Sequence, residues 1–96
     1  MFVVVAYDIP TTSSFGRRRQ RRISKVCKDY GIRVQRSVFE FHLQKHEWSE
    51  VRKKLLSELS KAEDNLRCYF LDAQTAENLE QHGIRSFLDP AEPLII

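Results

Sequence analysis

The chain has 96 residues, which is enough for one domain and leaves no room for a second hydrophobic core. Its hydrophobic content of 42% is ordinary for a globular protein, and no apolar run approaches the roughly 20 residues that a membrane-spanning helix needs. No basic region or cleavage site precedes Phe2, so we expect a cytoplasmic protein without a membrane partner. Cys27 and Cys68 lack metal-binding spacing and are expected to be buried free thiols.

The net charge of +3 is distributed unevenly along the chain. The segment from Arg17 to Arg36 contains nine Lys and Arg residues and a single acid, Asp29, and therefore carries +8. The remaining seven cations and twelve acids give the rest of the chain −5. A charge distribution this polarised indicates a polyanionic partner.

Residues 2–8 form the first predicted strand, in which six apolar or aromatic residues end in a carboxylate, Asp8. The run does not alternate with polar residues, so it predicts a central strand buried on both faces. Pro10 ends the strand because it has no N–H for the ladder. Asp8 is either a turn residue that bonds backbone N–H groups ahead of Pro10 or a functional carboxylate at a strand end.

The next predicted element is a helix over residues 15–30, capped by Ser13 or Ser14 and ended by Gly31 in a left-handed conformation. Its apolar positions form a stripe toward a core, and its cations fall on the opposite arc, except for Arg19, which falls near the stripe. A run of arginines could be an ordinary solvated face, but their mutual repulsion favours phosphate binding. The apolar positions are Phe15, Ile23, Val26, Cys27 and Tyr30, and the candidate phosphate ligands are Arg17, Arg18, Arg19, Arg21 and Arg22.

The apolar pattern of residues 32–43 slips by one residue, which predicts two strands joined by a hairpin or bulge near residues 35–38. A helix over 47–60, a strand over 66–71, a short helix within 72–81 and an extended segment at 84–88 follow. This order predicts an α+β, ferredoxin-like βαββαβ domain over residues 1–88, with two helices on one face of an antiparallel sheet. The uncovered sheet face and the apolar end of the tail, residues 89–96, predict a homodimer in which the tail joins the partner's sheet.

A single carboxylate holds a metal ion poorly, but a two-fold dimer could bring two copies of Asp8 together. With phosphates held by the arginine helix, this arrangement would suit metal-assisted phosphodiester hydrolysis.

Three stretches together resemble one known family: Val3 to Ile9, the basic helix closing on Asp29-Tyr30-Gly31, and Arg33 to Glu40. The chain is similar over residues 1–71 to CRISPR-associated protein two, the small adaptation subunit of bacterial and archaeal immunity. The resemblance implies a ferredoxin-like homodimer and a metal-dependent endonuclease acting on RNA or duplex DNA. It also implies a partner, because the family bridges dimers of the CRISPR integrase, CRISPR-associated protein one, during spacer integration.

The resemblance implies further that Asp8 of both chains binds Mg²⁺, for which Mn²⁺ could substitute. Tyr7 and Asp8 carry over as catalytic residues, and Arg33 and Phe39 as nucleic-acid-binding residues. Simpler roles stay open, because Phe39 could be a core residue and Tyr7 could pack at the dimer seam. Two other functions also stay open: a non-catalytic DNA-binding scaffold, and a general RNA-binding module, although the aromatic motif of the latter is absent.

Overall fold

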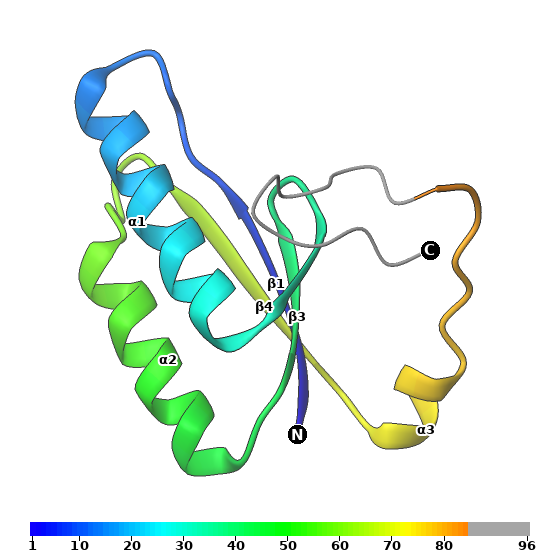
Figure 1. The fold of residues 1–96 in the computed structure, drawn as a ribbon. Coiled ribbons are helices and arrows are strands. Elements are labelled where there is room, and N and C mark those ends of the chain that lie inside the picture. The colour runs from blue at the N-terminus through cyan, green and yellow to red at the C-terminus, as the bar shows by residue number, and fades with distance from the viewer. Residues whose placement is uncertain (85–96) are drawn as a thin grey trace.

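The sheet is built around β1 (Phe2–Asp8), which lies between β3 (Val38–His42) and β4 (Asn65–Leu71). The computed structural model describes residues 1–84, and the sheet order within them is β2-β3-β1-β4, with β2 (Ile32–Gln35) at one edge. Each pair of neighbouring strands is antiparallel. Two helices, α1 (Ser14–Tyr30) and α2 (Lys45–Glu58), cover one face, and the short α3 (Ala73–Glu77) follows β4 (Figure 1). The predicted ferredoxin-like βαββαβ fold is confirmed.

The core lies between the sheet and the two long helices. Because side chains of a strand alternate between faces, Val3, Val5 and Tyr7 of β1 point toward the helices together and are buried. The fully buried side chains that surround them come from β3, α1 and α2: Ile23, Cys27, Phe39, Phe41, Val51 and Leu55. Burial, the main cause, raises the pKa of the Cys27 thiol to about 12. Both cysteines are free, as predicted, but Cys68 is only half-buried.

The slip predicted within residues 32–43 is a hairpin with an irregular register. Arg33 pairs with Phe39 and Gln35 with Val38, so one extra residue lies on β2 between the two pairs. This irregularity lets the apolar residues of β2 and β3 fit the same sheet although their sequence pattern changes phase.

The start of α1 is as predicted, since Ser13 Oγ accepts a hydrogen bond from Gly16 N at 3.1 Å. The expected left-handed conformation of Gly31 is wrong. Gly31 has φ −136° and ψ −171°, which is extended backbone open to any residue. Glycine is needed for space instead, because a Cβ there would lie 2.8 Å from Glu40 O and from the Phe41 ring. A sequence pattern cannot reveal this contact, since it joins the end of α1 to β3.

Other elements differ from the prediction at their ends. The second helix begins at Lys45, two residues early, where Gln44 N donates to the Glu47 side chain at 2.9 Å. α3 has only five residues, fewer than residues 72–81 would allow. Phe15 is not part of the buried stripe of α1, because its side chain is exposed.

The second face of the sheet is less covered than the first. Val4 and Ala6 of β1 are half-buried there, and Ile32 and Tyr69 of the flanking strands are exposed. That a second copy of the chain covers this face of the sheet stays a prediction. The domain boundary at residue 88 and the tail of residues 89–96 lie outside the described residues, as does all of the extended segment 84–88 except Ile84. Among residues 1–84, none of the helices has the length and hydropathy needed to cross a bilayer.

Candidate nucleic-acid interface

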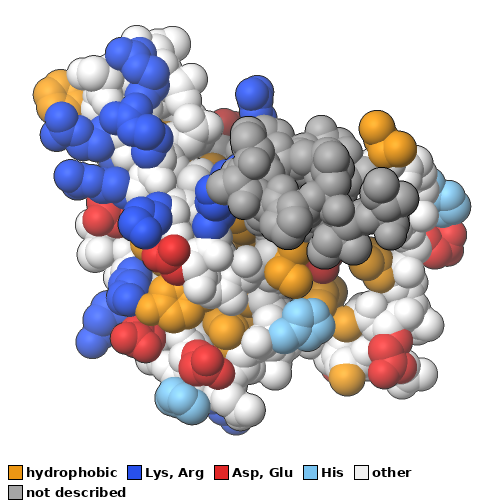
Figure 2. All heavy atoms as spheres, viewed as in Figure 1, with side chains coloured by type: hydrophobic (Ala, Val, Ile, Leu, Met, Phe, Trp, Pro, Cys, Tyr) orange, Lys and Arg blue, Asp and Glu red, His pale blue; other side chains and the backbone are white. Residues whose placement is uncertain are grey.

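The cations of α1 gather on one side of the molecule. Figure 2 shows Lys and Arg side chains clustered over this helix, at the upper left of the view. The first turn of α1 contains Arg17 and no acid, although the N-terminus of a helix carries a partial positive charge that favours acids. Cations placed against the dipole destabilise the free protein, and a bound polyanion would remove that cost. The placement therefore supports the expectation of a polyanionic partner.

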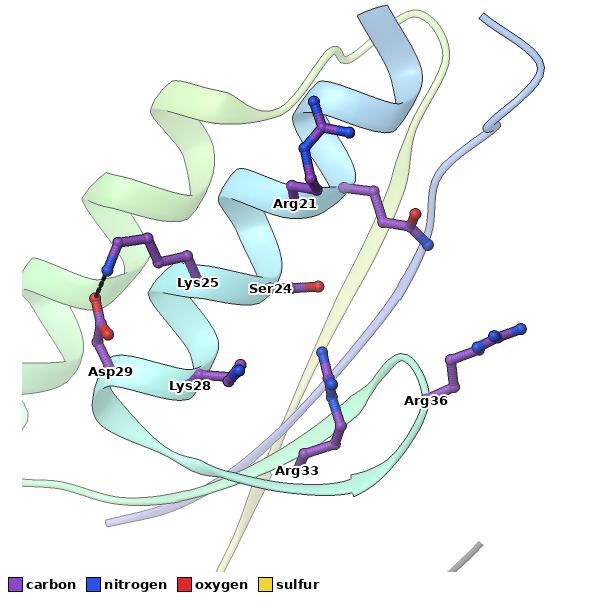
Figure 3. A pocket seen from close by; sticks show the side chains of 8 residues that line it. Arg21, Ser24, Lys25, Lys28, Asp29, Arg33 and Arg36 are labelled. Carbon is purple, nitrogen blue, oxygen red and sulfur yellow. Dashed lines mark hydrogen bonds and ion pairs between the residues drawn. The ribbon is translucent and has the colours of Figure 1, made fainter. Parts of the chain in front are cut away.

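A pocket of about 530 Å³ opens between α1 and the β2–β3 hairpin. Figure 3 shows Arg33 pointing from β2 toward α1, while Arg36 extends from the turn that follows. The pocket is lined by five cations and one acid, with two neutral polar residues: Gln20, Arg21, Ser24, Lys25, Lys28, Asp29, Arg33 and Arg36. Asp29 is 3.3 Å from Lys25 Nζ. Because its lining has five cations and one acid, the pocket carries a net positive charge that suits phosphate.

Arg33 is held in place by the core residue beneath it. Its guanidinium carbon lies 4.9 Å from the centre of the Phe39 ring, a cation–π contact. Phe39 itself is fully buried, so it cannot stack on a base. Phe39 could have been a core residue or a base-stacking residue, and its burial favours the core role. In that role its ring also contacts Arg33, a cation of the pocket.

Arg19 occupies a different environment from the other arginines of α1. Its Nε donates to Asp64 Oδ2 at 2.8 Å, and its Nη2 donates to Asp64 Oδ1 at 3.0 Å and Glu63 Oε2 at 2.9 Å. The Asp64 side chain is fully buried, and Ser60 N donates to it as well at 2.9 Å. The hydrogen bonds from Arg19, more than that from Ser60, hold the pKa of Asp64 below its ordinary value.

This bidentate pair makes Arg19 a weaker candidate for a phosphate ligand than the other arginines of α1. The guanidinium is bound to the loop between α2 and β4, so Arg19 ties α1 to that loop. Arg17 donates to Thr11 O at 3.1 Å, and Arg22 lies 3.5 Å from Glu58, both at the surface. Arg18 and Arg21 are exposed and make no hydrogen bond or ion pair with residues 1–84, which leaves both guanidinium groups to solvent.

Tyr7 and Asp8 are neighbours in β1 but lie on opposite faces of the sheet. Tyr7 is only 6% exposed, its hydroxyl shares a hydrogen bond with Ser24, and its ring stacks with Phe39 at 6.2 Å. It faces the helices, which argues against both a catalytic role beside Asp8 and a place at a dimer seam. Asp8 is exposed at the end of β1, paired in register with Asn65 of β4.

Asp8 supplies one exposed carboxylate at the end of β1. Residues 1–84 contain no group of three or more His, Cys, Asp or Glu side chains arranged to hold a metal ion. An exposed carboxylate with open surroundings fits Mg²⁺, which keeps several waters and uses one or two carboxylates together with substrate phosphates. The further ligands of such an ion would include waters and substrate phosphates.

Comparisons with known proteins place the chain in a family. The profile described as CRISPR associated protein Cas2 matches residues 1–79. A protein of Nitratidesulfovibrio vulgaris named CRISPR-associated endoribonuclease Cas2 is 43% identical, over all of this chain and 94% of that one. A protein of the same name from Chlorobaculum tepidum is also 43% identical, over the whole of both chains. The crystal structure of Streptococcus pyogenes Cas2 superposes with a TM-score of 0.77 at 36% identity, covering 86% of this chain and all of that one. The chain therefore belongs to the CRISPR-associated protein Cas2 family.

Proposed function

We propose that the chain is a metal-dependent endonuclease of CRISPR-based antiviral defence, cleaving RNA with Asp8 as its metal-binding carboxylate. The observation that carries the proposal is the cation-lined pocket between α1 and the β2–β3 hairpin, in a fold whose β1 ends in an exposed carboxylate. The names of the two relatives from Nitratidesulfovibrio vulgaris and Chlorobaculum tepidum support RNA as the substrate, since both are called endoribonucleases.

The proposed active form is a homodimer. Residues 1–84 contain no group of three or more metal-binding side chains, and a second copy would bring another Asp8 to share Mg²⁺ or Mn²⁺. The exposed Ile32 and Tyr69 beside half-buried Val4 and Ala6 support a second copy on the open sheet face. Light scattering at micromolar concentration tests this form, and a mass near 11 kDa would contradict it.

Each part of the site has a proposed task in the reaction. Arg18 and the pocket cations, Arg21 among them, bind backbone phosphates and orient the strand, which lowers the entropic cost of reaching the transition state. The metal, when bound at Asp8, supplies Lewis-acid stabilisation of the charge on the phosphate. Water adds to phosphorus and loses a proton to solvent, the bond between phosphorus and the leaving oxygen breaks, and that oxygen takes up a proton from solvent.

The test compares wild type with Asp8→Ala on labelled single-stranded RNA and on duplex DNA, with Mg²⁺, Mn²⁺ or EDTA. Cleavage that requires both metal and Asp8, with binding unchanged in the variant, would support the proposal. Glu50→Ala is the matched control, because Glu50 is an exposed acid on α2, away from β1. Cleavage that is indifferent to Asp8→Ala would refute the assignment.

A second candidate function is a non-catalytic scaffold that binds duplex DNA and bridges dimers of the CRISPR integrase. The absence of a ligand cluster around Asp8 within residues 1–84 favours it, since the cationic surface does not depend on a metal. On this account the double variant Arg18→Glu/Arg21→Glu abolishes spacer integration, whereas Asp8→Ala leaves it intact. Lys53→Glu, which reverses an exposed cation on α2, controls for the general loss of positive charge.

A further inference from the structure

One exposed aromatic residue lies among the cations of α1. Phe15 is the second residue of the helix and is 71% exposed. The other large exposed hydrophobic residues of the described chain lie elsewhere, at its start, on the sheet, or after β4: Met1, Ile32, Tyr69, Phe70, Leu79 and Ile84. Phe15 is therefore not part of an apolar patch of the kind that protein partners cover.

The helical neighbours of Phe15 are arginines. Residues three, four and seven positions later share its side of a helix, and these are Arg18, Arg19 and Arg22. Arg19 is tied to Asp64, but Arg18 is exposed without a partner in the described residues. At 3.6 residues per turn, Arg18 lies between Phe15 and Arg21, and Arg21 lines the cation-lined pocket. One nucleic-acid strand that crosses α1 could thus contact first the pocket with Arg21, then Arg18, and then Phe15.

The position of Phe15 is fixed relative to the end of β1. Gly16 packs so closely on the preceding loop that a Cβ on it would lie 1.9 Å from Pro10 O. Pro10 is two residues beyond Asp8, so the backbone of Gly16 lies on the order of 10 Å from Asp8. A nucleic-acid strand with a phosphate at Asp8 can therefore also reach the ring beside Gly16.

We infer that Phe15 is a stacking platform for an unpaired base, with Arg18 binding an adjacent phosphate. The inference rests on the proposed function and specifies its substrate class as single-stranded nucleic acid. A base in a duplex is already stacked on its neighbours and offers no free face to a phenyl ring, whereas every unpaired base does.

The experiment measures binding in EDTA, so its outcome does not depend on cleavage. A single-stranded RNA carrying 2-aminopurine is titrated with wild type, Phe15→Leu and Phe15→Tyr, and a duplex of the same sequence is titrated in parallel. Stacking quenches 2-aminopurine fluorescence, so wild type and Phe15→Tyr are expected to quench it. Phe15→Leu keeps an apolar side chain of similar size but should lose the quenching, with affinity reduced between about fivefold and about a hundredfold. Duplex affinity should not change.

Phe70→Leu is the matched control, because it makes the same substitution at an exposed phenylalanine on β4. Equal affinity and equal quenching for wild type and Phe15→Leu would overturn the inference while leaving the Asp8 assignment untouched. A Phe15→Leu variant that binds RNA normally but changes the mass of the protein in solution would also overturn it, and would place Phe15 in a protein contact. Failure of wild type to bind single-stranded RNA would overturn both the inference and RNA as the proposed substrate.

Discussion

Replacing Tyr7 with Phe separates a structural role from a catalytic one. The substitution removes one hydroxyl, keeps the ring that stacks on Phe39, and leaves Ser24 without its hydrogen-bond partner. Because Ser24 is half-buried and can turn to solvent, the loss should be that of one ordinary hydrogen bond, about 1 kcal/mol. In a chain of this length the melting temperature should fall by about 4–8 °C. Cleavage and nucleic-acid binding should stay within about twofold of wild type, since Tyr7 faces away from Asp8.

The assay combines thermal unfolding at fixed protein concentration with a double-mutant cycle. Ser24→Ala alone should cost about as much as Tyr7→Phe, and the double variant should cost less than the sum, because both partners of one hydrogen bond are then gone. The reasoning fails if Tyr7→Phe lowers cleavage by about tenfold or more while stability and binding are unchanged. That result would support a catalytic role for Tyr7.

Three further predictions concern the framework of the site. The lowered pKa of Asp64 means that its contribution to stability is present above the unfolded-state pKa and is lost as pH falls through the folded-state value. Asp64→Asn should therefore flatten the dependence of melting temperature on pH below about pH 4, and an unchanged acid limb would contradict the assignment. Gly31→Ala should destabilise by about 1–3 kcal/mol in denaturant titration, because the new Cβ meets backbone and ring atoms of β3; a neutral result would show that the contact yields easily. Cys27 should stay unlabelled by a thiol reagent at pH 8 until the protein unfolds, because burial keeps its thiol protonated; labelling at the rate of the half-buried Cys68 would refute this.

The parts of the fold that depend on local pattern could be predicted from the sequence. The apolar run of β1, the Ser13 cap and the phase change between β2 and β3 each express a rule that spans a few residues. The partner of Arg19 could not be predicted, because Asp64 is 45 residues away and no spacing rule links them. The space requirement at Gly31 is equally non-local, since it is set by β3.

Two features of the candidate site depend on the faces and burial of particular side chains. The opposite orientations of Tyr7 and Asp8 follow from strand alternation, so the sequence already contains this part of the geometry. The aromatic residue available for stacking is Phe15 rather than Phe39, and its arginine neighbours at helical spacing are the signal that could have identified it. Phe15 is exposed and Phe39 is fully buried, so only Phe15 can stack on a base. Sequence pattern does not give this difference, because it depends on how the elements pack.

The alternation within β1 also limits how short a substrate can be. Asp8 lies on the open face of the sheet, whereas the pocket formed by Arg21, Lys28 and Arg33 lies on the side that carries the helices. A ligand that engages both must pass around the end of the sheet where the loop after Asp8 leads into α1. A mononucleotide can contact either Asp8 or the cation-lined pocket, but not both at once. A ligand that contacts both must be a continuous strand of several nucleotides.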